Sequence, residues 1–346
     1  MRRAALAGLV LCSAAVSLSS CGTDASPPTA QSKSFPPATP GVSLAVASSS
    51  CGPATHPGGL VIDQVVTPAA FGIAVRDDGL AYFTEVYNGG VGITSTQTRT
   101  VDGFIPTGAI PTGVAFSPSG ATAYVTNQYS NNVGVIDVAS AQQVATIPTP
   151  GGESPFVVRV SPDGSRLFIS TNTTTVYIVD TQTLQVIGSV QVGFAPNGFA
   201  VHPDGRIIYV SASFGGSVTE VDMFTGTVLR TFNVGGIAQD MAVTRDGNRL
   251  YVANGSGYLN EIELTSGQTT ATIDLAGEAF GIGVTPDDTQ AYVSLPGVGV
   301  VQVFNLQSRR LAQTLDVGGD PRRIGFSQQG HIGAIANLSG YVTFVR

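Results

Sequence analysis

Three charged residues stand where repeated copies of one sequence pattern otherwise carry small or apolar residues. Arg159 aligns with alanine or glycine in the other six copies, whereas Asp240 and Arg323 share a column of four glycines and one valine. A guanidinium binds carboxylates and other anions, and a carboxylate binds cations and hydrogen-bond donors. Asp240 and Arg323 therefore predict a binding site that carries both signs of charge. Because an unpaired buried charge is costly, Arg159 is either half of a structural ion pair or an anion-binding residue.

A mixed ring of side chains lies one position before the column of Asp240 and Arg323. Its members are Phe71, Thr112, Phe156, Asn197, Gln239, Phe280 and Arg322. We interpret the ring as the mouth of a channel that suits a modest ligand or the side chain of a partner. The residues assigned to this mouth are Phe71, Glu85, Phe156, Arg159, Asp240, Glu278, Phe280, Arg322 and Arg323. The alternative is a set of solvated loop charges without a ligand.

A second interpretation of the same residues is a hydrolase or lactonase. Glu85, Asp240 and Glu278, together with asparagine oxygens, would hold a divalent cation such as calcium, and the cation would polarise a carbonyl group. The three histidines fall in the linker or at tight turns, and no paired-cysteine, Ser-His-Asp or phosphate-loop pattern is visible. We therefore assign no catalytic residue and predict no cofactor, although a quinone would leave no mark in the sequence.

These positions belong to seven copies of a pattern whose period is about 42 residues. The first turn of each copy is marked by Gly79, Gly120, Gly164, Gly205, Gly247, Asp288 and Gly330. Each copy runs from a small, apolar strand through a turn such as Ser-Pro-Asp-Gly (161–164) to a strand such as Tyr-Val-Thr-Asn (124–127), and then to a valine-rich strand. This period in a strand-rich chain predicts an all-β, seven-bladed β-propeller with four antiparallel strands in each blade.

The Tyr-Val-Thr-Asn sequence at 124–127 carries a resemblance to a known family. With its variants in the other copies, it resembles the YVTN repeat propellers, and the resemblance covers about residues 59–346. The family implies the fold but no fixed chemistry, because its members share a scaffold rather than a reaction.

The ring is expected to close with strands from both ends of the chain. The seventh copy ends without an outer strand, and residues 60–66 match the outer-strand pattern, so this N-terminal segment is predicted to complete the last blade. The connections between second and third strands, and those between blades, then share one face, which we call the loop face. The chain should enter on the opposite face, which carries the tight turns.

The N-terminus has the layout of a bacterial lipoprotein signal. Residues 1–20 contain Arg2 and Arg3 followed by an apolar run too short to cross a bilayer, and small residues precede Cys21. We predict a signal peptide at 1–20, lipidation of Cys21, a disordered tether rich in proline, serine and threonine at 21–58, and the propeller at 59–346. Cys51 would then be the single cysteine of the mature chain without a lipid, which excludes a disulfide framework.

Composition limits the partners. The formal net charge is −7 and only 11% of residues are charged, so a surface built to neutralise phosphates, and with it nucleic acid, is not expected. The function predicted from the sequence is a monomeric, lipid-anchored propeller in the bacterial cell envelope. It lies on the extracytoplasmic side of a membrane and binds a protein, peptide or glycan through its loop face. The divalent-cation hydrolase is the alternative, and enzymatic activity is left unassigned.

Overall fold

The computed structural model describes residues 60–327 and 332–346. They fall in a compact unit that extends from Gly58 to Arg346. The predicted signal peptide, Cys21 and the tether at 21–58 lie outside the described residues, as does the turn residue Gly330.

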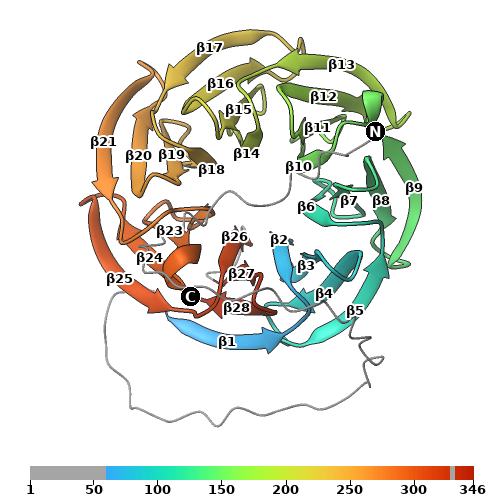
Figure 1. The fold of residues 1–346 in the computed structure, drawn as a ribbon, viewed down its shortest axis with the longest axis horizontal. Helices are drawn as coiled ribbons and strands as arrows, with labels where there is room; N and C mark the ends of the chain where they lie inside the picture. The colour runs from blue at the N-terminus through green and yellow to red at the C-terminus, as the bar shows by residue number, and fades with distance from the viewer. Residues whose placement is uncertain (1–59, 328–331) are drawn as a thin grey trace, which may run out of the picture. The chain divides into compact units, whose positions relative to one another are not determined.

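Seven four-stranded antiparallel sheets are arranged in a ring around a common centre, as Figure 1 shows. The first three blades comprise β2 (Ala70–Val75), β3 (Leu80–Glu85), β4 (Gly90–Ser95) and β5 (Val101–Pro106); β6 (Pro111–Phe116), β7 (Thr122–Asn127), β8 (Asn132–Asp137) and β9 (Gln142–Pro148); and β10 (Pro155–Val160), β11 (Arg166–Thr171), β12 (Thr175–Asp180) and β13 (Gln185–Gln191). Blades 4 and 5 comprise β14 (Pro196–Val201), β15 (Ile207–Ala212), β16 (Ser217–Asp222) and β17 (Val228–Asn233); and β18 (Ala238–Val243), β19 (Arg249–Asn254), β20 (Tyr258–Glu263) and β21 (Gln268–Asp274). Blades 6 and 7 comprise β22 (Ile282–Val284), β23 (Gln290–Leu295), β24 (Val300–Asn305) and β25 (Arg310–Asp316); and β26 (Pro321–Phe326), β27 (Gly333–Asn337), β28 (Tyr341–Val345) and β1 (Val61–Val66). The predicted fold class is confirmed.

Two short 3₁₀ turns, η1 (Pro150–Gly152) and η2 (Pro296–Val298), lie in loops. Among the residues that the structure describes, no helix has the length and apolar character needed to span a membrane.

The N-terminal strand closes the ring, as the sequence predicts. β1 pairs antiparallel with β28, with Val65 opposite Val342 and Gln64 opposite Thr343. In Figure 1 the blue β1 accordingly lies alongside the red β28. The main chains of Leu60 and Arg346 exchange hydrogen bonds of 2.7 and 2.9 Å. Since β28 runs from the loop face toward the tight-turn face, residue 60 lies on the tight-turn face.

A bulge in the first strand of blade 1 creates a contact with the neighbouring blade. In blade 1 the β2–β3 register shifts between Ala70 and Ile73, so the N–H of Gly72 has no ladder partner. The hydroxyl of Thr84 accepts that N–H at 2.8 Å and lies 3.3 Å from the carbonyl oxygen of Thr112 in blade 2. We call this arrangement the hydroxyl link. It recurs at Thr126, Ser211 and Ser294.

The hydroxyl link explains the column of glycines in the first strands. A Cβ atom on Gly72 would lie 2.1 Å from the carbonyl oxygen of Thr112, and one on Gly281 would lie 2.2 Å from that of Arg322. Neither approach is tolerated between a carbon and a backbone oxygen. Glycine is therefore required where the next blade comes close enough to accept the hydroxyl proton.

The asparagine that ends the Tyr-Val-Thr-Asn pattern anchors a loop. Asn254 donates to the carbonyl of Gly235 at 2.9 Å and accepts from the N–H of Ile237 at 2.9 Å, which holds the connection that enters blade 5. Asn337 makes the same pair of contacts in blade 7. In blade 3 this strand-end position is occupied by Thr171.

The acidic residues at the ends of the third strands hold turns. Asp180 accepts from the N–H of Thr183 at 2.8 Å, and Asp222 accepts from the N–H of Thr225 at 2.9 Å. Hydrogen bonds from Thr225 and Arg206 lower the pKa of Asp222 to about 2. These carboxylates are structural.

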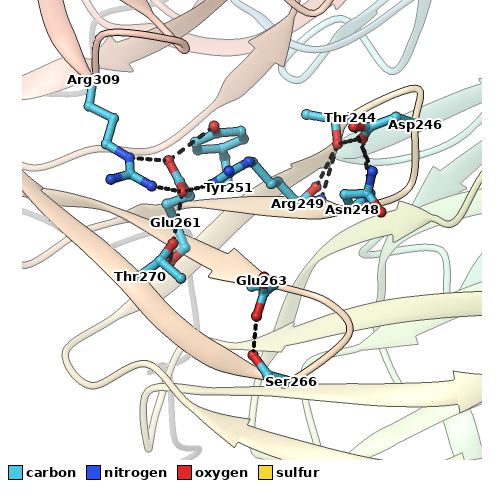
Figure 2. Close-up of polar contacts among 10 residues, drawn as sticks. All are labelled: Thr244, Asp246, Asn248, Arg249, Tyr251, Glu261, Glu263, Ser266, Thr270 and Arg309. Atoms are coloured by element: carbon cyan, nitrogen blue, oxygen red, sulfur yellow. Dashed lines mark hydrogen bonds and ion pairs between the residues drawn. The ribbon is translucent and has the colours of Figure 1, made fainter.

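Two buried glutamates, unexplained by the sequence, tie blades 4, 5 and 6 together. Glu261 in β20 is fully buried and accepts from Arg309 of blade 6 at 2.8 and 3.1 Å, from Thr270 at 2.8 Å and from Tyr251 at 3.2 Å (Figure 2). Arg249 of the same blade also contacts this carboxylate. One carboxylate thus connects neighbouring blades on the tight-turn side.

The second glutamate acts through an arginine. Glu220 in β16 accepts from Arg230 at 2.6 Å, and the guanidinium of Arg230 also reaches the carbonyl of Leu264 in blade 5. Arg230 packs over the ring of Phe232, with 4.7 Å between the guanidinium carbon and the ring centre. Each acid in an apolar column is therefore explained by an arginine that bridges to the next blade.

Glu261 should contribute to stability in a pH-dependent way. Burial raises its pKa, but hydrogen bonds from Arg309 and Thr270 and the charge of Arg249 outweigh burial, so the pKa lies below its ordinary value of 4.5. The stabilisation is then complete above pH 4.5 and is lost as pH falls through the lower, folded-state pKa. Glu261→Gln should lower the free energy of unfolding at pH 7 by about 1–3 kcal/mol.

The measurement is urea unfolding of both proteins from pH 7 down to pH 3. The difference between them should shrink as the pH falls. The matched control is Glu263→Gln, which alters an exposed carboxylate in the same strand (Figure 2). A difference that stays constant with pH would contradict the charge-based role of Glu261.

Candidate functional site

The hydroxyl link is lost in the two blades that carry a charge in the glycine column. Blade 5 has Asp240 in the column and Ala253 in place of the hydroxyl residue, and blade 7 has Arg323 with Ala336. In blade 5 the N–H of Asp240 donates directly to the carbonyl of Phe280 at 3.2 Å. In blade 5 a direct main-chain hydrogen bond to the next blade thus takes the place of the hydroxyl link.

Asp240 and Arg323 form a buried ion pair across the channel. Asp240 Oδ1 lies 2.7 Å from Arg323 Nη1, and both side chains are at least nine-tenths buried. Arg323 Nη2 donates to the carbonyl oxygen of Asn197 at 2.5 Å and to its Oδ1 at 2.8 Å. Asn197 in turn donates to Gln239. One guanidinium thus joins blades 4, 5 and 7, although Asp240 Oδ1 accepts no hydrogen bond of normal angle.

Aromatic rings from three blades meet at the loop-face end of the channel. Phe71 packs edge-on against Phe156 and Phe280, with ring centres 5.7 and 5.4 Å apart. The guanidinium of Arg322 lies over Phe280 at 4.8 Å and over Phe71 at 5.7 Å, and that of Arg323 lies over Phe280 at 5.2 Å. Phe71, Phe280 and Arg322 are buried. We call this group the aromatic plug, because its side chains fill the predicted mouth.

Arg322 has a partner that the sequence interpretation missed. Its Nη2 donates to Asp320 at 2.8 Å, while its buried Nε has no hydrogen-bond partner. Asp320 lies two residues before Arg322, in the loop between blades. That short spacing was the feature of the sequence that could have predicted the ion pair. The other partner that the sequence interpretation missed is Asn197. Its place in the predicted ring identified it as a residue of the mouth, but not as the residue that accepts hydrogen bonds from Arg323.

Arg159 lies close to the ion pair without joining it. It makes a single long hydrogen bond, 3.4 Å from its Nη1 to the carbonyl of Val158. Among the described residues no carboxylate lies within ion-pair distance of it. Desolvation lowers the pKa of Arg159, the charge of Asp240 raises it and that of Arg323 lowers it. Arg159 therefore lies within electrostatic range of both partners of the buried pair.

Glu85 and Glu278 are not part of this group. Glu85 is buried, but its Oε1 lies beside Gly92 of β4, within the sheet of blade 1. Its Oε2 accepts a hydrogen bond from the side-chain amide of Asn88 at 2.7 Å. Burial raises the pKa of Glu85 and the bond from Asn88 only partly opposes the rise. Glu278 is exposed in the loop that enters blade 6. Across residues 60–327 and 332–346, no three His, Cys, Asp or Glu side chains gather closely enough to hold a metal ion.

Two surface pockets lie away from the channel. One, of about 490 Å³, is lined by outer strands of blades 4 and 5 around Arg230 and Gly267. The other, of about 300 Å³, lies between blades 5 and 6 and is lined by residues that include Arg249 and Arg309. The arginines of both pockets already contact the buried Glu220 and Glu261, so we do not assign the candidate site there.

The ion pair across the channel should behave as one unit. Asp240→Ala leaves Arg323 buried without its counter-charge and should cost about 3–5 kcal/mol of unfolding free energy. The double variant Asp240→Ala/Arg323→Ala removes both charges and should cost less than the sum of the two single changes. Urea unfolding of the four proteins at pH 7 measures the coupling. Additive losses would mean that the two side chains stabilise the ring independently.

Comparison with known proteins agrees with the fold. Residues 94–234, which extend from β4 to the end of blade 4, match the family model described as lactonase, 7-bladed β-propeller. The uncharacterized protein YncE of Salmonella typhi and that of Salmonella typhimurium are each 29% identical to this chain over 153 residues. The match spans 42% of this chain and 42% of each relative, so it covers less than half of their length.

A solved structure gives a longer match at lower identity. The hydrazine synthase of Kuenenia stuttgartiensis superposes with a TM-score of 0.74 over 81% of this chain and 96% of that chain, at 20% identity. At this identity the likeness concerns the fold alone. The chain is thus a seven-bladed β-propeller, with a region similar to the lactonase-type propellers and to YncE.

Proposed function

We propose that this protein is a binding propeller that docks a polypeptide on its loop face. The observation that carries the proposal is a set of exposed aromatic side chains in loops of that face. Tyr87, Tyr129, Phe194 and Phe214 are 80%, 49%, 50% and 52% exposed. We call these four residues the aromatic rim.

The rim has the chemistry of a protein interface. Tyrosine and phenylalanine are enriched in the buried centres of interfaces because they bury a large area at little entropic cost. Tyr87 and Tyr129 occupy equivalent loops of blades 1 and 2, and Phe194 contacts Phe214 at blade 4, with ring centres 5.7 Å apart. Because the rim is spread over separate blades, a polypeptide can contact more of it than a single sugar can.

The lactonase-type match supports a second candidate, a divalent-cation-dependent hydrolase. The geometry favours binding over this candidate. Within the described ranges, the predicted ligands Glu85, Asp240 and Glu278 form no metal-binding group.

Site-specific photo-crosslinking tests the docking proposal. A photoreactive phenylalanine analogue at Phe214 should form discrete crosslinked polypeptide bands in intact cells. The matched control is the same analogue at Phe224, which is 49% exposed but lies in a tight turn on the opposite face. Replacing Tyr87 and Tyr129 with serine should reduce the Phe214 crosslink at least tenfold. Equal crosslinking from both positions, or none from Phe214, would overturn the proposal.

A lipid on Cys21 would complete this function by holding the propeller at the cell envelope. Because residue 60 lies on the tight-turn face, an anchor on the preceding chain would leave the aromatic rim free to meet a partner. Cys21→Ser should move the protein from the membrane fraction to the soluble fraction of a cell lysate, without changing its melting temperature. If membrane retention is unchanged, the lipid-anchor proposal fails.

A further inference from the structure

The charges of the channel do not balance. Arg322 pairs with Asp320 at 2.8 Å and Arg323 pairs with Asp240 at 2.7 Å. Arg159 remains, without a carboxylate among the described residues. Three guanidinium groups therefore face two carboxylates in one narrow part of the protein.

Burial makes the surplus charge of Arg159 costly. An arginine keeps its proton near neutral pH, so it cannot escape the cost by becoming neutral. Its one hydrogen bond, to Val158, is long and leaves most of its donors without a protein partner. A partly buried charge with so few protein partners is stable only when an anion or water reaches it.

Arg159 stands where every other blade carries a small residue. The equivalent residues of the other blades are Ala74, Ala115, Ala200, Ala242, Gly283 and Gly325. Arg159, Ala74 and Gly325 are partly exposed to solvent, whereas Phe71, Phe280 and Arg322 of the aromatic plug are buried. The first strands run from the loop face toward the tight turns, so Arg159 lies beyond the plug when viewed from the rim.

We propose that the channel binds one carboxylate group at the guanidinium of Arg159, beside Arg323. Arginine donates two parallel hydrogen bonds to a carboxylate, which matches the free donors of Arg159. The surplus is a single positive charge, and Asp240 nearby repels a second negative charge, so a monoanion fits better than a phosphate dianion. Because the aromatic plug separates this site from the rim, the carboxylate comes from a small organic acid. The site is independent of polypeptide docking.

The test is a melting-temperature titration of the full-length protein with sodium acetate, replacing sodium chloride at constant ionic strength. The wild-type melting temperature should rise with acetate concentration, because a ligand that binds only the folded state stabilises it. Arg159→Ala should remove the rise, with an apparent dissociation constant at least tenfold weaker. Alanine is compatible with the fold there because four other blades carry it.

Two further variants make the result specific. Arg310→Ala removes an exposed positive charge from an outer strand and should respond to acetate as the wild type does. Arg159→Lys keeps the charge but lacks the forked donors, and it should bind acetate several-fold more weakly than wild type. This variant also serves if Arg159→Ala does not fold.

The source of the carboxylate is tested with N-acetylaspartate N-methylamide, which imitates the acidic side chain of a polypeptide. If N-acetylaspartate N-methylamide binds more weakly than acetate, the result supports a small organic acid as the ligand. If it binds as tightly or more tightly, the ligand is instead an acidic side chain of a partner. The proposal is overturned if acetate leaves the wild-type melting temperature unchanged, or if Arg159→Ala and Arg159→Lys respond as strongly as wild type.

Discussion

The ring depends on a peptide N–H near the start of the first strand that has no ladder partner in its own blade. A buried N–H must be satisfied, and in blades 1, 2, 4 and 6 a serine or threonine hydroxyl does so while it contacts a carbonyl of the next blade. The local defect of one sheet thus becomes the attachment between two sheets. Glycine in the first strand follows from the same contact, because the neighbouring carbonyl occupies the place of a side chain.

Charge enters the channel where that attachment is absent. Asp240 and Arg323 take the glycine positions of blades whose hydroxyl is replaced by alanine, and their ion pair spans blades that are not adjacent in the ring. The ring therefore exchanges short links between neighbours for one long link across the centre. The ion pair places ionisable groups where little water reaches them. In such surroundings a charged group that lacks a partner costs more free energy than it would at the surface.

The repeat period predicted most of the architecture, because one residue pattern returned at nearly constant spacing. Its columns also identified Arg159, Asp240 and Arg323 as departures. They could not identify Asn197 as the acceptor of Arg323, since that contact depends on how the ring curves. Glu85 was placed at the mouth because it ends a strand on the loop face. Its side chain lies against Gly92 instead, on the same face of the sheet as Phe83. The alternation of side chains along a strand already implied that placement.

The same limit explains the two buried glutamates. Glu220 and Glu261 interrupt apolar columns, and the sequence offered no reason for them. Glu261 is neutralised in part by Arg309 of the next blade, and such a contact is invisible to a comparison of blades one at a time. Glu220 pairs with Arg230, its cross-strand neighbour in the same blade. The Tyr-Val-Thr-Asn pattern, by contrast, serves the scaffold throughout. Tyrosine and valine fill the core, threonine links blades and asparagine holds a loop.

The pairing of β1 with β28 also sets an order of events during synthesis. β1 leaves the ribosome before any blade exists, yet its partner is the last strand of the described chain. Until β28 emerges, β1 and the growing edge of the ring both present unpaired backbone groups. Such edges readily pair with another chain. While the ring is open, a second nascent copy can therefore supply the missing strand, and only closure within one chain removes that competition.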